Sequence, residues 1–132
     1  MSPPGGNLTP PQLEVMEIVW TAGKTGVSVA DIWEAISRSR RVARTTVLTV
    51  IQRLEQRGWL RRRQARGATR YVATTDRGRT VGRVADEFIQ EFFDGSATEL
   101  VRSLLGTGRL KPAEVNRLRA MLDEADAKGG RS

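Results

Sequence analysis

Residues 44–57 read RTTVLTVIQRLEQR, and after Gly58 the chain continues with WLRRRQARGATRYVA over residues 59–73. The apolar residues of the first stretch recur at helical spacing, which predicts a helix with one buried face that ends at Gly58. In the second stretch the helical period is lost. Gly67 stands between two short runs there, so we predict a strand, a turn and a second strand. The apolar face of the helix consists of Val47, Val50, Ile51 and Leu54.

The opposite face of this helix carries small hydroxyls and arginines. Threonine is a mediocre helix former, so three threonines on the exposed side favour a contact role over ordinary helix surface. An α-helix fits the major groove of DNA, where Arg reads guanine and Thr contacts a base or a thymine methyl group. Of these residues, Arg53 is expected to contact a phosphate rather than a base. The candidate DNA-binding residues of the helix are Arg44, Thr45, Thr46, Thr49 and Arg53.

Two further helices are predicted upstream. Thr9 is placed to cap the first helix, with Pro10 at its first position, Gln12 completing a capping box and Gly23 at its end. Ser28 is placed to cap a short amphipathic second helix, and residues 40–43 form the turn into the third. Three short helices followed by a basic hairpin predict a winged helix-turn-helix, a mainly α fold with a small β-wing. The apolar residues of the second helix are Val29, Ile32, Trp33 and Ile36.

The net charge of +7 lies entirely in the N-terminal part of the chain. Residues 1–75 contain 12 Lys and Arg against 5 Asp and Glu, whereas residues 76–132 contain 10 of each. Between residues 38 and 70 there are eleven Arg and one acid, Glu55. Such a field attracts phosphate backbones, and Arg suits bidentate contacts to phosphate or guanine. A basic face that is merely solvated is the alternative. The candidate DNA-binding residues of the wing are Arg62, Arg63, Arg66 and Arg70.

Several classes of function are excluded by composition. The 132 residues contain no Cys and no His, which excludes thiolate or imidazole metal sites and the common nucleophile–histidine pairs. Asp86, Glu87 and Glu91 lie at helical spacing, which indicates a solvated face rather than a catalytic cluster, and no phosphate-binding Gly loop occurs. We expect no enzymatic activity, no cofactor and no metal. No secretory signal and no apolar run of membrane-spanning length is found, so a cytoplasmic protein without a membrane partner is expected.

The segment 76–132 is predicted to be helical, with strong apolar stripes and no excess charge. A segment of this size cannot bury that much apolar surface alone, so we expect it to form a homodimer. The alternative is a monomer in which these helices fold back on the N-terminal part. The predicted domains are a winged-helix DNA-binding domain over residues 1–75 and a helical dimerisation domain over residues 76–132. The candidate interface residues are Phe88, Phe92, Leu100, Val101, Leu104, Leu118 and Leu122.

The same residues carry a resemblance to a known family. The motif Thr-Val-x-Thr-x-x-x-Arg-Leu, at residues 46–54, resembles the penicillinase-repressor family of the BlaI/MecI type, with the copper-responsive CopY repressors as relatives. The resemblance covers roughly residues 8–125. Further matching segments are Leu8-Thr9, Glu14-Val15-Met16, Val19-Trp20, Val29-Ala30-Asp31-Ile32, Arg70-Tyr71, Phe92-Phe93-Asp94-Gly95-Ser96 and Leu100-Val101.

This resemblance implies a homodimeric transcriptional repressor that binds double-stranded DNA. Each winged helix would read one half of a dyad-symmetric operator, with Thr45, Thr46, Thr49 and Arg53 on the recognition helix. A non-specific or architectural DNA-binding protein is the alternative within nucleic-acid binding. A protein-interaction adaptor is a second alternative, and it leaves the eleven Arg without a role.

The chain departs from the family pattern in three places. Ser103-Leu104 stand where members induced by proteolysis have an Asn-Phe cleavage bond, so a sensor protease or another inducer is left open as a partner. The Cys-rich tail of the copper-responsive members is missing, which excludes metal induction by that route. Val42 replaces the tryptophan that is common before the recognition helix, so different packing is expected there.

Overall fold

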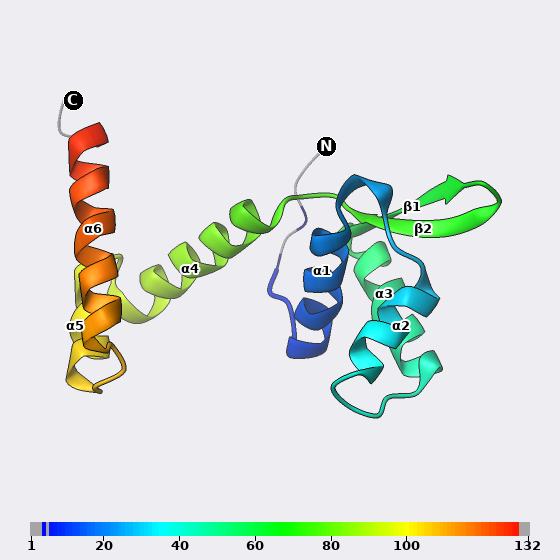
Figure 1. Cartoon of the computed structure of the whole chain (residues 1–132), viewed down its shortest axis with the longest axis horizontal. Coiled ribbons are helices and arrows are strands. Elements are labelled where there is room, and N and C mark those ends of the chain that lie inside the picture. Colours follow the sequence, from blue (N-terminus) through cyan, green and yellow to red (C-terminus); the bar gives the residue numbers. More distant parts are fainter. Residues whose placement is uncertain (1–3, 5, 130–132) are drawn as a thin grey trace. The chain divides into compact units, whose positions relative to one another are not determined.

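The computed structural model describes residues 4 and 6–129 and divides into two compact units, Met1–Val84 and Ala85–Ser132 (Figure 1). The structure is mainly helical with one two-stranded sheet, which confirms the predicted fold class. Its elements are α1 (Pro10–Ala22), the 3₁₀-helix η1 (Gly23–Thr25), α2 (Val29–Ser37), α3 (Arg44–Gln56), β1 (Leu60–Ala65), β2 (Ala68–Ala73), α4 (Arg77–Phe93), α5 (Ala97–Gly106) and α6 (Pro112–Gly129).

The predicted helix starts are confirmed by their caps. At the start of α1 the Gln12 backbone N–H donates to Thr9 Oγ1 (3.3 Å), and the Thr9 N–H donates to Gln12 Oε1 (3.0 Å). This reciprocal pair satisfies two N–H groups that the helix itself leaves without partners. Ser28 caps α2 in the same way by accepting from the Asp31 N–H (3.1 Å). The residue after α1 is Gly23, whose φ of 71° ends the helix as expected.

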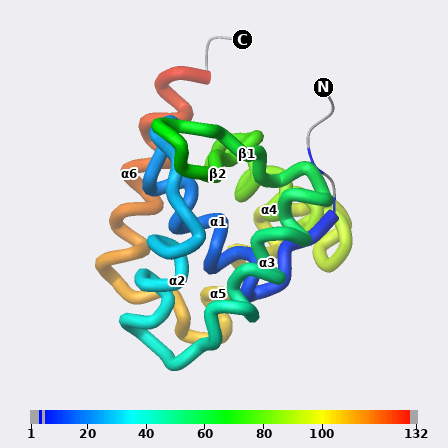
Figure 2. Tube along the Cα trace, turned by 90° about the vertical axis from the view of Figure 1, so that its right-hand side faces the viewer, coloured from blue at the N-terminus to red at the C-terminus, as the bar shows by residue number. Residues whose placement is uncertain are grey.

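The core of the N-terminal unit lies between α1, α2 and α3, which contact one another, with the hairpin at one end (Figure 2). The apolar face predicted for α3 is confirmed: Val47, Ile51 and Leu54 are buried, and Val50 is partly buried against them. The other large side chains that are fully buried are Val15, Met16, Val19, Ile32 and Trp59.

The predicted hairpin is confirmed. Strands β1 and β2 pair antiparallel and are joined by the two-residue turn Arg66–Gly67, with φ values of 53° and 79°. Two successive left-handed residues give the turn a twist that matches the strands, and Gly adopts this conformation without strain. Val27 forms a single isolated bridge to β2, because its N–H donates to the Tyr71 carbonyl (3.1 Å) and the Tyr71 N–H donates to the Val27 carbonyl (2.8 Å).

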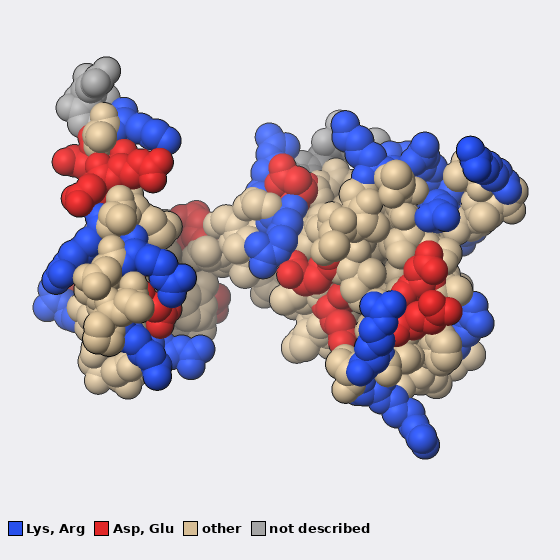
Figure 3. Space-filling view, in the orientation of Figure 1, with Lys and Arg blue, Asp and Glu red and all other residues tan. Residues whose placement is uncertain are grey.

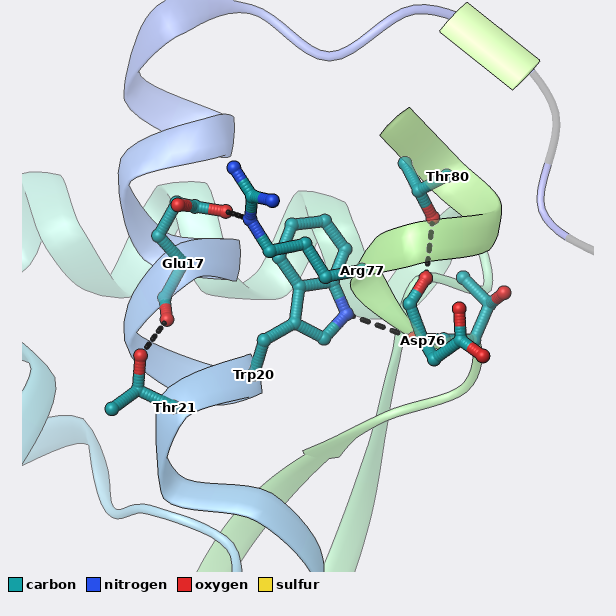
Figure 4. A network of polar contacts seen from close by, with 7 residues as sticks. Glu17, Trp20, Thr21, Asp76, Arg77 and Thr80 are labelled. Carbon is teal, nitrogen blue, oxygen red and sulfur yellow. Dashed lines mark hydrogen bonds and ion pairs between the residues drawn. The ribbon is translucent and has the colours of Figure 1, made fainter. Parts of the chain in front are cut away.

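The start of α4 belongs to the N-terminal unit. The Trp20 indole N–H donates to the Thr75 carbonyl (2.8 Å), Arg77 pairs with Glu17 (2.7 Å) and Thr80 is buried (Figure 4). The compact unit therefore reaches Val84, whereas the domain boundary expected from the sequence lies at residue 75. The expected boundary marks where the excess of positive charge ends, but the start of α4, beyond that residue, still packs on α1.

The second unit consists of the rest of α4 with α5 and α6. Asp94 and Gly95, with φ values of 50° and 83°, end α4, and Ser96 caps α5 by accepting from the Glu99 N–H (3.2 Å). The Ser103–Leu104 bond lies inside α5. No residue between 85 and 129 is buried, although the helices carry many large apolar side chains.

Candidate nucleic-acid interface

The outward face of α3 presents the polar residues predicted from the sequence. Thr45, Thr46, Thr49 and Arg53 are all exposed. The Thr49 hydroxyl donates to the Thr45 carbonyl (3.0 Å), which leaves the oxygen of that hydroxyl able to accept a hydrogen bond. Within the described part of the chain, the Arg53 side chain makes no hydrogen bond or ion pair. The helix therefore brings together hydroxyl, methyl and guanidinium groups on one solvent-facing stripe.

Two glutamines lie on the same stripe and were not among the residues predicted to bind DNA. Gln52 and Gln56 line a shallow polar hollow of about 530 Å³ together with Thr49 and Arg53. An amide side chain can donate and accept at once, which suits the edge of adenine. The helical period places Gln52 on the exposed face from sequence alone, and the same period extends that face to Gln56.

The start of α3 is held by the turn that precedes it. The Trp33 indole N–H donates to the Val42 carbonyl (2.9 Å), which fixes the end of the turn between α2 and α3. The Arg44 guanidinium lies over the same indole ring, 5.8 Å from its centroid. Arg44 is thereby positioned by a cation–π contact while its charge stays exposed. Val42 packs against the core where the family pattern has tryptophan.

The wing arginines divide into two groups. Arg62, Arg63 and Arg70 have partners inside the protein, whereas Arg66, at the turn, has none among the described residues. Arg62 Nε lies 2.8 Å from Glu55 Oε2, and this hydrogen bond is the main cause that raises the pKa of Arg62 above its ordinary value. Three of the four wing arginines predicted to bind DNA, along the phosphates or in the adjacent minor groove, therefore also make contacts within the protein.

Arg63 and Arg70 lie directly opposite one another in the hairpin. Their like charges would repel, but each guanidinium is held by a backbone carbonyl. Arg63 Nη1 donates to the Lys24 carbonyl (2.6 Å), and Arg70 Nη1 donates to the Gly26 carbonyl (3.2 Å). Arg63 remains exposed and Arg70 is half-buried, so both retain surface for a further contact.

Lys and Arg side chains gather over the hairpin of the N-terminal unit and over the loop between α2 and α3 (Figure 3). Within residues 4 and 6–129, no group of three or more acidic residues is placed to hold a metal ion. The described helices also include none with the length and apolar character needed to cross a bilayer.

A family model described as penicillinase repressor matches residues 8–124. The chain belongs to the penicillinase-repressor family. This confirms the resemblance seen in the sequence. Penicillinase repressors from Bacillus licheniformis and Staphylococcus aureus are 22% identical over 113 residues and 25% identical over 115 residues. These alignments cover 86% and 87% of this chain, and 87% and 90% of the two relatives.

A solved winged-helix structure shares the fold of this penicillinase-repressor chain. MepR, a transcription regulator of the Staphylococcus aureus multidrug efflux pump MepA, matches with a TM-score of 0.50 and 20% identity, covering 92% of this chain and 80% of its own. The monomeric form of Bacillus licheniformis BlaI, solved in complex with the blaP half-operator, matches with a TM-score of 0.48 and 19% identity. That match covers 55% of this chain and 87% of BlaI.

Proposed function

We propose that this protein is a transcriptional repressor that binds double-stranded operator DNA, sequence-specifically, as a homodimer. The observation that carries the proposal is the outward face of α3, where Thr45, Thr46, Thr49 and Arg53 stand exposed beside a cationic hairpin. The family relationship adds support, because both relatives carry the name penicillinase repressor. BlaI, in the same family, was solved with a half-operator.

The two groups of residues take different roles in this proposal. The α3 residues enter the major groove, where their hydroxyl, methyl and amide groups can distinguish base pairs. Arg44 and the wing arginines contact the phosphate backbone, which fixes the orientation of the protein but carries no sequence information. Arg66 is the wing residue best supported for this role, because none of its nitrogens has a partner among the described residues.

The homodimer is supported by the exposed apolar surface of the second unit. Phe92 and Leu122 are 64% and 66% exposed, and Phe88 and Val101 are also among the exposed large apolar residues. Leu100, Leu104 and Leu118 are half-buried. Apolar exposure on this scale marks an interaction surface, and a second copy presents the same helices for mutual burial. Two copies related by a two-fold axis would read a dyad-symmetric operator.

Selection from a random pool of DNA duplexes tests the function. The full-length protein is mixed with the pool at moderate salt, and the bound fraction is sequenced. We expect one enriched motif with dyad symmetry. Retention of DNA without any enriched motif would instead support a non-specific binder, whose affinity depends on salt but hardly on sequence. A motif without symmetry would contradict the homodimer while leaving sequence-specific binding intact.

A further inference from the structure

A second surface feature lies away from the outward face of α3. It is a groove of about 760 Å³ formed by the end of α1, η1, one face of the hairpin and the segment that leads into α4. All of these residues belong to the N-terminal unit. We call it the wing-base groove. The residues used in the argument below are Trp20, Lys24, Arg61, Arg63, Val72 and Arg77.

The floor of the wing-base groove is apolar and fixed. Val72 is buried, and the half-buried Trp20 lines the same groove. The Trp20 ring cannot turn freely, because its N–H donates to the Thr75 carbonyl at 2.8 Å (Figure 4). A flat apolar surface that is already in position binds a planar molecule without the cost of ordering it first.

The rim of the groove is cationic. Arg63 and Arg77 are anchored, the first to the Lys24 carbonyl (2.6 Å) and the second to the Glu17 carboxylate (2.7 Å). The side chains of Lys24 and Arg61 make no hydrogen bond or ion pair with another described residue. Two positive charges therefore line the groove without a counter-charge among the described residues.

The acids near the groove do not neutralise this rim. Glu17 is occupied by Arg77. Asp76 lines the groove, but its carboxylate accepts from the Arg79 backbone N–H (2.6 Å) at the start of α4, so it serves the helix end. Four cationic side chains thus face two carboxylates that are both already engaged, and the excess of charge is positive.

We infer that the wing-base groove binds a small organic anion with a flat apolar body, of the aromatic carboxylate class. The ring would lie on Trp20 and Val72, and the carboxylate would take hydrogen bonds from Lys24 and Arg61, which suit oxyanions. A bare phosphate would leave the apolar floor uncovered, and a neutral aromatic molecule would leave the cations unpaired. The apolar floor and the cationic rim are both occupied only by a ligand that carries a negative charge and an aromatic ring.

The test is a titration of the full-length, ¹⁵N-labelled protein with 2-naphthoate, followed by NMR of the tryptophan indole N–H groups. We expect the Trp20 signal, assigned with Trp20→Phe, to shift saturably while the Trp33 signal stays in place. The neutral 2-naphthamide should bind about tenfold more weakly, since it loses a charge-assisted hydrogen bond. The double variant Lys24→Ala/Arg61→Ala should weaken naphthoate binding to a similar extent.

The matched control is Arg38→Ala/Arg41→Ala, which removes two exposed charges outside the groove and should leave naphthoate affinity unchanged. Three outcomes would each overturn the inference. They are an affinity for 2-naphthamide equal to that for 2-naphthoate, binding of inorganic phosphate at the site as tight as that of 2-naphthoate, and an unchanged naphthoate affinity in Lys24→Ala/Arg61→Ala. The absence of a saturable Trp20 shift would overturn it as well. Because no DNA enters this titration, its result is independent of the proposed repressor function.

Discussion

Glu55 of α3 and Arg62 of β1 form an ion pair, with Arg62 Nε 2.8 Å from Glu55 Oε2, that connects the helix to the hairpin. Glu55 is the one acid among the eleven arginines of residues 38–70. The pair therefore masks one positive charge in the region proposed to face DNA. The pair also joins the two elements proposed to bind DNA: α3, which enters the major groove, and the hairpin, which contacts the phosphate backbone.

The substitution Glu55→Gln should strengthen DNA binding irrespective of sequence. Loss of the carboxylate releases the Arg62 charge, so affinity should rise and the slope of log affinity against log salt should steepen by about one. The urea midpoint of unfolding should hardly change, because exposed ion pairs contribute little. Fluorescence anisotropy with labelled duplexes across a salt series measures both quantities. The control is Glu34→Gln, which removes an exposed acid on α2. A fall in DNA affinity for Glu55→Gln would mean that the Glu55–Arg62 pair is needed to orient Arg62.

Arg53→Ala should weaken binding evenly across sequences. Arg53 is exposed on α3 and has no partner among the described residues, so its removal leaves the fold intact. Loss of one phosphate contact is expected to reduce the salt slope by about one. Affinities for the selected operator and for a scrambled duplex, compared at several salt concentrations, give the answer. If Arg53→Ala weakened binding to the operator but not to the scrambled duplex, Arg53 would contact a base rather than a phosphate.

Thr46→Ala should instead reduce discrimination between sequences. The change removes a hydroxyl and a methyl group from the outward face of α3, so the operator should lose about 1 kcal/mol of binding free energy while the scrambled duplex loses little. The ratio of the two dissociation constants is the measured quantity. Thr21→Ala, on α1, supplies the control for loss of an exposed threonine. If the ratio of the two dissociation constants were unchanged in Thr46→Ala, Thr46 would not contact a base.

Much of this fold follows from local signals in the sequence. Thr9 and Gln12 mark the start of α1, and Arg66–Gly67 mark the hairpin turn, because caps and tight turns depend on residues close together in the chain. Contacts between distant segments left no such signal. The bond from Trp20 to Thr75 spans 55 residues, and it explains why the compact unit continues into α4.

The same distinction applies to the candidate site. The helical period predicts which α3 residues face outward, and the structure agrees for Thr45, Thr46, Thr49 and Arg53. Composition alone treats the wing arginines as equivalent. Arg66 has no partner among the described residues, whereas Arg63 is anchored to the Lys24 carbonyl in η1. This difference depends on how η1 approaches the hairpin, which no local pattern encodes.

Gly26→Ala should destabilise the N-terminal unit by about 1–3 kcal/mol. Gly26 has a φ of 77°, and a Cβ there would lie 3.1 Å from both the Tyr71 carbonyl and Arg70 Cβ. Gly67→Ala is the matched control, since Gly67 has a similar φ of 79° but open space around it. All three tryptophans lie in this unit, so urea unfolding followed by their fluorescence reports its stability. Equal losses for the two variants would show that close packing at Gly26 contributes nothing beyond backbone strain.

Phe92→Asp should convert the proposed homodimer to a monomer. Phe92 is 64% exposed in the single chain, and its ring lies 4.8 Å from that of Phe88, so the pair presents an aromatic surface to solvent. A carboxylate at this position would be buried without a partner in a dimer, and burying an unpaired charge is strongly unfavourable. The isolated chain should tolerate the change, because Phe92 is not part of a buried core. Sedimentation equilibrium should therefore show a folded monomer. The control Leu13→Asp, at an exposed apolar residue of α1, should remain dimeric.

The Phe92→Asp monomer should also bind a full operator more weakly than the parent protein does. It should bind a half-operator as well as the parent protein does, since each winged helix keeps its own contacts. A Phe92→Asp protein that sediments as a dimer would exclude this surface from the interface.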